Sequence, residues 1–284
     1  MAQRTGLVST SVAALLVAVG VASAGTLDRI GQEKAIRFAN REDARPFSYK
    51  DKLGEPAGFM VDLCRAVAKK LAEQLNLPSL NAAYVSVTAA DRFEAITQQK
   101  ADILCEPTSV TLSRRAQVDF SIPTFLDGAG LIVRAGGPKN LRDLAGQKIG
   151  VLAGTTTEEA LRNTLKEAQI NGDVVTAKTH GEGLAMLDEG KISAYFGDRS
   201  ILLFVIKDSK APEKLRLADD YLSVEPYALA LPRGDSDFRL AIDRALSHIY
   251  RSGEIAAVFQ RTFGGKAEPS QILRTLYLIS ALPD

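Results

Sequence analysis

The spacing of apolar residues predicts alternating strands and helices in the first part of the chain. Short apolar runs at 35–39, 83–87 and 102–105 have the length and composition of strands. After the first run, an apolar residue at every fourth position predicts an amphipathic helix that ends before Pro78: Phe59, Leu63, Val67, Leu71 and Leu75. A second helix is expected at about 90–99. This order predicts a parallel sheet with helices on its faces.

A second alternating block follows the glycine-rich connector at 127–130. Its expected strands are 131–134, 148–152, 173–178 and 192–196, and its expected helices begin near Thr155 and at about Leu184. Thr155 and Glu158 have the spacing of a capping box, so this helix start either caps itself or offers N–H groups to an anion. Asp198 falls at the carboxyl end of the last strand, where open α/β sheets place ligand groups.

Extended runs between 215 and 231 read as a second crossover, after which helical patterns resume at about 238 and continue into a tail beyond Pro269. The chain therefore divides into two lobes. We expect the first lobe to be discontinuous, with residues 25–127 and 226–284, and the second to comprise 128–225. Hinges are expected near 127–131 and 223–226.

Residues 1–24 have the features of a secretory signal peptide. Arg4 precedes an apolar run at 7–21, and Ala22-Ser23-Ala24 resembles a cleavage site. A membrane anchor is the alternative, but this run is short for a span. Export would place Cys64 and Cys105 in an oxidising compartment, where an even number of cysteines favours a disulfide over two free thiols.

Charge and composition exclude several classes of function. Removing Arg4 from 35 basic residues leaves 34, which equals the number of acidic residues, so bulk charge gives no argument for a nucleic-acid partner. With two histidines and no ligand-like spacing, we expect no metal site. Neither a cofactor motif nor a convincing catalytic triad is found, so the sequence predicts no cofactor and no enzyme.

Hydroxyl groups and arginines follow the strand at 102–105. Ser109 and Thr111 offer hydroxyl donors, and the Arg114 fork can pair with a carboxylate through two parallel hydrogen bonds. From the residues alone, a solvated surface turn is the simpler interpretation. However, Thr111-x-x-Arg114 followed by Val118-Asp119-Phe120-Ser121-x-Pro123 resembles the signature of periplasmic solute-binding proteins for polar amino acids, in which this arginine binds the ligand α-carboxylate.

The resemblance extends to about Gly264 through Gly58-x-x-Val61-Asp62-Leu63, Leu144-x-Gly146-x-Lys148, Gly154-Thr-Thr156 and Gly190-x-x-x-Ala194-Tyr195-x-x-Asp198. It implies an α/β periplasmic binding protein fold. Each lobe would be a mostly parallel sheet flanked by helices, and two hinge strands would allow closure on a ligand. The Cys105 context also matches the family and supports a bond with Cys64.

Within this family the chain is most similar to glutamate/aspartate-binding proteins, through Arg41-Glu42, Pro46-Phe47-Ser48-Tyr49 and Ala177-Lys178-x-His180-Gly181. The resemblance implies that Arg114, Ser109 and Thr156 bind the α-carboxylate. Asp198 would bind the ammonium, while Arg41 and His180 would bind the distal carboxylate. Two arginines against Asp198 would neutralise a ligand of charge −1. A ligand carboxylate beside His180 would favour imidazolium, so affinity is expected to fall as the pH rises through the imidazole range.

The resemblance implies a periplasmic, monomeric protein that binds an acidic amino acid and delivers it to an ABC transporter permease in the inner membrane. It is not expected to be a catalyst. One alternative is an enzyme similar to cyclohexadienyl dehydratases, with Glu106 as a general acid. Glu106-Pro107 replaces smaller residues of the family pattern, which keeps that alternative open. A sensor of amino acids is a further alternative.

Overall fold

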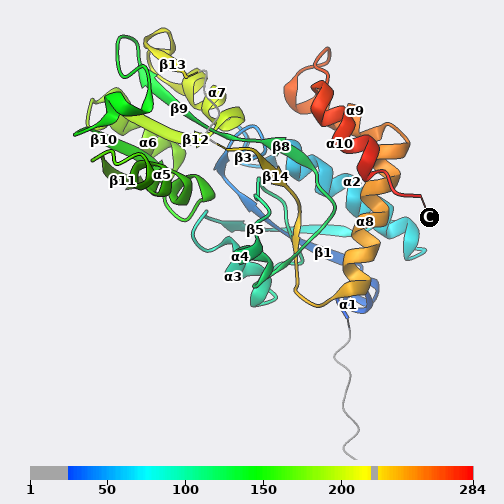
Figure 1. Ribbon diagram of the computed structural model, residues 1–284. Coiled ribbons are helices and arrows are strands. Elements are labelled where there is room, and N and C mark those ends of the chain that lie inside the picture. Colours follow the sequence, from blue (N-terminus) through cyan, green and yellow to red (C-terminus); the bar gives the residue numbers. More distant parts are fainter. Residues whose placement is uncertain (1–24, 219–222, 284) are drawn as a thin grey trace, which may run out of the picture.

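Two five-stranded sheets form the framework of the molecule, as a computed structural model shows (Figure 1). It describes residues 25–218 and 223–283, so the expected signal peptide at 1–24 lies outside the described residues. The first sheet has the order β5-β1-β6-β15-β7 and the second has the order β11-β10-β12-β9-β13. Helices flank both sheets, which confirms the α/β, two-lobe architecture.

In the first lobe, three adjacent strands pair in parallel: β1 (Ala35–Arg41), β5 (Asn81–Val87) and β6 (Ile103–Leu104). β15 (Ala230–Leu231) runs in the opposite direction and pairs with β6 and with the edge strand β7 (Asp119–Phe120). The helices are α1 (Thr26–Glu33), α2 (Phe59–Gln74), α3 (Arg92–Thr97), α4 (Leu112–Arg115), α8 (Ser236–Arg251), α9 (Glu254–Phe263) and α10 (Gln271–Ser280). A small sheet of β2 (Asp43–Ala44), β3 (Ser48–Lys50) and β4 (Pro56–Ala57) adjoins β1.

The second lobe repeats this arrangement. Its parallel strands are β10 (Lys148–Leu152), β11 (Asp173–Ala177) and β12 (Ala194–Asp198), and the reversed strand β9 (Ala129–Arg134) pairs with β12 and with the edge strand β13 (Leu215–Leu217). Its helices are α5 (Thr156–Glu167), α6 (His180–Asp188) and α7 (Arg199–Asp208), with short 3-10 turns at η1 (Leu141–Leu144) and η2 (Pro212–Lys214). Both sheets are thus mixed, because in each one a single reversed strand forms two antiparallel pairs beside the parallel core.

One antiparallel pair of strands connects the two lobes. β8 (Phe125–Asp127) pairs with β14 (Glu225–Tyr227), and in Figure 1 this pair runs between the sheets. Phe125 stacks on Tyr227 with ring centroids 6.2 Å apart, and Phe47 meets the Phe125 ring edge-on at 4.8 Å. These buried rings anchor the connecting strands to the first lobe.

The helix α2 confirms the helix predicted from apolar residues at every fourth position, and its N-terminus binds the loop that precedes it. Its N–H groups at Phe59 and Met60 donate to Pro46 O and Phe47 O at 3.0 and 2.9 Å. The backbone at Gly58 has φ of 119°, and a Cβ there would lie 2.4 Å from Phe47 O, so only glycine fits this approach. The loop that follows β1 is thereby fixed on the end of α2.

The predicted disulfide between Cys64 and Cys105 is present. It joins α2 to the residue that follows β6, and both cysteines are buried. The bond therefore ties a core helix to the start of the segment that carries Ser109 and Arg114.

Replacing both cysteines with alanine should lower the free energy of unfolding. The bond closes a loop with a sequence separation of 41 residues. In the chain-entropy model, a loop of this length contributes about 4 kcal/mol. Urea unfolding of the wild type and the double variant measures the difference, and equal midpoints and slopes would contradict the expectation.

Candidate functional site

A small polar cavity lies between the lobes, at the carboxyl ends of parallel strands from both sheets. Its lining includes all six residues proposed from the sequence, although they come from distant parts of the chain: Arg41, Ser109, Arg114, Thr156, His180 and Asp198. Arg92, Pro107 and Thr157 also line it. The fold therefore brings the proposed set together at one place.

Arg114 is held at one end of this cavity by the short helix α4. Thr111 caps that helix, since its hydroxyl accepts from the Arg114 N–H at 3.1 Å, and it does not line the cavity. Arg114 Nη1 donates to Ser109 O at 2.8 Å, and the guanidinium lies 5.3 Å over the Phe93 ring. Burial lowers the pKa of Arg114, while the nearby carboxylates of Glu106, Glu225 and Asp198 favour its charged form.

Glu225 bridges hydroxyl groups from the two lobes beside Arg114. Thr156 Oγ1 donates to Glu225 Oε2 at 2.7 Å, and the Ser109 hydroxyl donates to the same oxygen. Ser223 Oγ donates to Glu225 Oε1 at 2.7 Å. Glu225 lies in a segment for which the sequence pattern predicts only an extended run, and that pattern assigns it no role.

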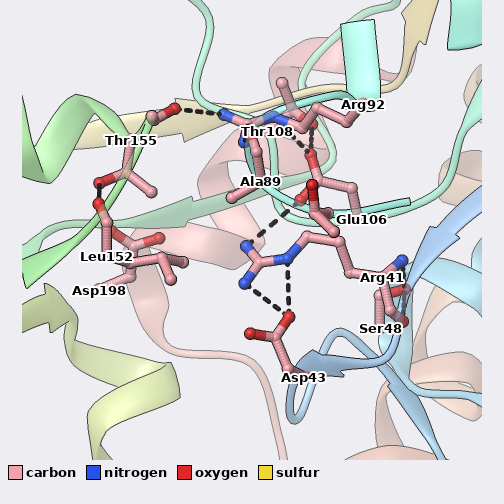
Figure 2. A network of polar contacts seen from close by, with 12 residues as sticks. Arg41, Asp43, Ser48, Ala89, Arg92, Glu106, Thr108, Leu152, Thr155 and Asp198 are labelled. Carbon is pink, nitrogen blue, oxygen red and sulfur yellow. Dashed lines mark hydrogen bonds and ion pairs between the residues drawn. The ribbon is translucent and has the colours of Figure 1, made fainter. Parts of the chain in front are cut away.

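Arg41 ends β1 and is engaged by two carboxylates of the protein (Figure 2). Its Nε and Nη2 donate to Asp43 Oδ1 at 2.9 and 2.7 Å. Its Nη1 lies 3.8 Å from Glu106 Oε2. Burial, the largest single influence, would raise the pKa of Asp43, but the charges and hydrogen bonds of Arg41 and His180 together outweigh it and lower the pKa, which favours the ionised carboxylate.

Arg92 lies on the other side of Glu106. The sequence pattern indicated no role for Arg92, because this residue stands at the start of a predicted amphipathic helix. Arg92 Nε is 3.4 Å from Glu106 Oε1, as Figure 2 shows. Its other guanidinium nitrogens donate to Ala89 O and to Gly154 O in the second lobe. Burial lowers the pKa of Arg92 to about 10, so it remains a cation at neutral pH.

Glu106 is fully buried behind these two arginines and does not line the cavity. The Thr108 hydroxyl donates to its Oε1. Its Oε2 has no hydrogen-bond donor among the described residues and faces Arg41 only across the longer ion-pair distance. The carboxylate is thus surrounded by groups of the protein.

His180 begins α6, whereas the sequence analysis placed the start of this helix near Leu184. Its backbone N–H donates to Asp43 Oδ2 at 3.1 Å, and its Nδ1 lies 3.1 Å from Tyr195 Oη. Burial lowers the pKa of His180 to about 3, and Arg41 opposes its charged form further. The imidazole is therefore neutral, and the expected loss of affinity across the imidazole titration range is not supported by this geometry.

Asp198 ends β12, is half-buried, and lies near the buried carboxylates of Asp127 and Glu225. Thr157 Oγ1 donates to Asp198 Oδ1 at 3.1 Å, and burial raises the pKa of Asp198 to about 6, with the Glu225 charge acting in the same direction. Asp127 in β8 accepts from Ser200 N at 3.2 Å, and burial raises its pKa to about 7. Sequence reasoning treated Asp127 only as part of a connector.

The charge balance inferred from the sequence was incomplete. It counted two arginines and one aspartate, whereas the structure surrounds the cavity with more charged groups: Arg41, Arg92, Arg114, Asp43, Glu106, Asp198 and Glu225. If all are ionised, carboxylates exceed guanidinium groups by one. The sum of +1 for Arg41, Arg114 and Asp198 therefore does not describe the charge of the whole cluster.

The described residues contain no group of three or more His, Cys, Asp or Glu side chains arranged to hold a metal ion. Within the same residues, no helix combines the length and apolar character needed to cross a bilayer.

Two lobes with a polar cavity between them are the architecture of a protein that encloses a small ligand. The chain belongs to the bacterial extracellular solute-binding proteins, family 3, which match its residues 36–265.

Similar proteins include binding proteins for acidic amino acids. An L-glutamate/L-aspartate-binding protein of Pseudomonas aeruginosa is 30% identical over 262 residues, covering 90% of this chain and 87% of the relative. A glutamate/aspartate import solute-binding protein of Salmonella typhimurium is 28% identical over 252 residues, covering 88% and 83%. The solved structure of the ancestral amino acid-binding protein AncCDT-1, a precursor of cyclohexadienyl dehydratase, has a TM-score of 0.74 and 26% identity. The match covers 84% of this chain and 99% of that one.

We expect amino acid affinity to fall as the pH is lowered from 8 to 5. A ligand ammonium needs the ionised form of Asp198, whose pKa is raised to about 6, so acid protonates the carboxylate and competes with the ligand. One unit below that pKa, the loss should be about tenfold. Titration calorimetry at several pH values measures it, and an affinity that is constant or rises on acidification would contradict the expectation.

Proposed function

We propose that the protein captures an amino acid in the periplasm, closes its lobes around it and presents it to an ABC transporter permease in the inner membrane. The observation that carries this proposal is that Arg114 from the first lobe and Asp198 from the second line the same cavity. A guanidinium suits an α-carboxylate and a carboxylate suits an ammonium, so the two groups of an amino acid would bridge the lobes. The glutamate/aspartate import relatives support the transport role.

An acidic amino acid, glutamate or aspartate, is the ligand we propose. Arg41, Arg92 and His180 lie at the end of the cavity where a side-chain carboxylate would reach. Both curated relatives described above are named for glutamate and aspartate. One ligand per monomeric chain is expected.

We propose that closure occurs about β8 and β14, with the first lobe comprising 25–127 and 226–284 and the second 128–225. Several polar contacts support this motion because they join the lobes only when closed. Ser109 Oγ lies 3.2 Å from Thr156 Oγ1, and Arg92 reaches Gly154 O at 3.4 Å. A ligand that touches both lobes would stabilise this closed form by its differential affinity.

We further propose that the protein is not a catalyst. Glu106, the residue considered as a general acid, faces Arg41, Arg92 and Thr108 and is absent from the cavity lining. A general acid must reach the substrate, which this position does not favour. Incubation with prephenate or arogenate tests the point, since formation of an aromatic product would contradict it.

Replacing Arg114 with alanine should abolish most amino acid binding. The variant removes the partner of the α-carboxylate, a loss of about 2–5 kcal/mol for a buried charge pair. Arg115→Ala is a matched control, because Arg115 is the next residue of α4 and is exposed. Calorimetry with glutamate and aspartate measures both variants. Equal affinities of wild type and Arg114→Ala would refute the proposed orientation of the ligand.

A further inference from the structure

The guanidinium of Arg41 already has a carboxylate at every nitrogen. Asp43 Oδ1 accepts from Nε and Nη2, and Glu106 Oε2 faces Nη1 at 3.8 Å. Arg41 is only 3% exposed, so solvent contributes little to compensating its charge. The positive charge at this end of the cavity is thus paired within the protein itself.

The charge of Arg92 is also paired within the protein, although its Nε makes no hydrogen bond among the described residues. Glu106 Oε1 lies 3.4 Å from its Nε, while Ala89 O and Gly154 O accept from its other nitrogens. Two arginines therefore share the end of the cavity with two acidic residues, Asp43 and Glu106. The local charge of these four groups is zero when all are ionised.

Asp43 also stands where a distal carboxylate of a ligand would be expected. Its Oδ1 binds Arg41, and its Oδ2 accepts from the N–H of His180 at the first position of α6. A helix N-terminus and a guanidinium together favour an anion. Here Asp43 of the first lobe is that anion, and it binds the N-terminus of α6 in the second lobe.

We propose that Asp43 and Glu106 determine specificity by providing the counter-charges of Arg41 and Arg92, so that the cavity accepts carboxamide side chains nearly as well as carboxylates. This inference rests on the proposed function. Where an arginine depends on the ligand for its only anion, an amide ligand leaves a buried cation unpaired and is strongly rejected. Here the cations stay paired with either ligand, and a ligand carboxylate meets two fixed negative charges.

The test compares glutamate with glutamine by titration calorimetry on the wild type and on the Asp43→Asn/Glu106→Gln variant. Wild type should prefer glutamate by less than about tenfold, because its arginines are already neutralised. In the variant, that preference should grow by at least about tenfold, because Arg41 and Arg92 then need the ligand carboxylate. Asp43→Asn alone serves if the double variant does not fold, with the same direction expected.

Glu42→Gln is the matched control. Glu42 adjoins Asp43 in the sequence but pairs with Lys50 at 2.9 Å and with Ser86 at the surface, away from Arg41. The control should keep the wild-type ratio of affinities.

A wild-type preference for glutamate of about tenfold or more, or a ratio that the variant leaves unchanged, overturns the inference and leaves the proposed function intact. If none of glutamate, glutamine, aspartate and asparagine binds to wild type, the proposed function itself fails. The two failures are therefore distinguishable.

Discussion

A charged side chain can leave water only if an opposite charge or a set of hydrogen bonds compensates it, and the cavity between the lobes concentrates this constraint. Arg41, Arg92 and Glu106 are nearly or fully buried, at 3%, 2% and 0% exposure. Each is stable there only because the others are close. The position of these groups consequently depends on both lobes and on the strands that end at the cavity.

The surrounding fold makes this arrangement rigid. The disulfide fixes the segment after β6 to α2, and the backbone of α2 in turn binds the loop at Pro46 and Phe47. Because that loop continues β1, the end of β1 at Arg41 is positioned by the same helix that bears Cys64. The buried rings of Phe47, Phe125 and Tyr227 attach the connecting strands to this unit. During lobe closure, the second lobe would then move relative to the connecting strands, because these contacts attach the strands to the first lobe.

Hydrophobic periodicity was sufficient to predict many of the helices and strands. For example, α2 buries one apolar face, and β10 buries a continuous apolar run. The helix start at Thr155 is also confirmed: its hydroxyl accepts from Glu158 N, while Glu158 accepts from Gly154 N instead of Thr155 N, so the cap forms without the reciprocal bond of a full capping box. The same spacing at Thr179 and Glu182 marks the true start of α6 and was overlooked.

Tertiary contacts explain the residues of the site that the sequence did not reveal. Arg92, Asp43 and Glu225 are polar residues in segments that look solvated or extended. Only the packing of distant strands brings Arg92 into the cavity lining and Asp43 and Glu225 into contact with the lining residues Arg41 and Thr156. Neither hydrophobic periodicity nor the local spacing of residues predicts contacts between residues that are distant in the sequence. Arg41, Arg114 and Asp198 could be found because the family resemblance carries information on tertiary structure that a single pattern lacks.

The most direct test of the central claim is calorimetry of protein that has been unfolded, freed of bound solute and refolded with its disulfide intact. Titration with each of the twenty amino acids should show one site per chain, with glutamate, aspartate and their amides binding most tightly. Aliphatic amino acids should bind far more weakly, because their side chains would leave the polar end of the cavity without hydrogen-bond partners. Tightest binding of an aliphatic amino acid, or binding of none, would contradict the account.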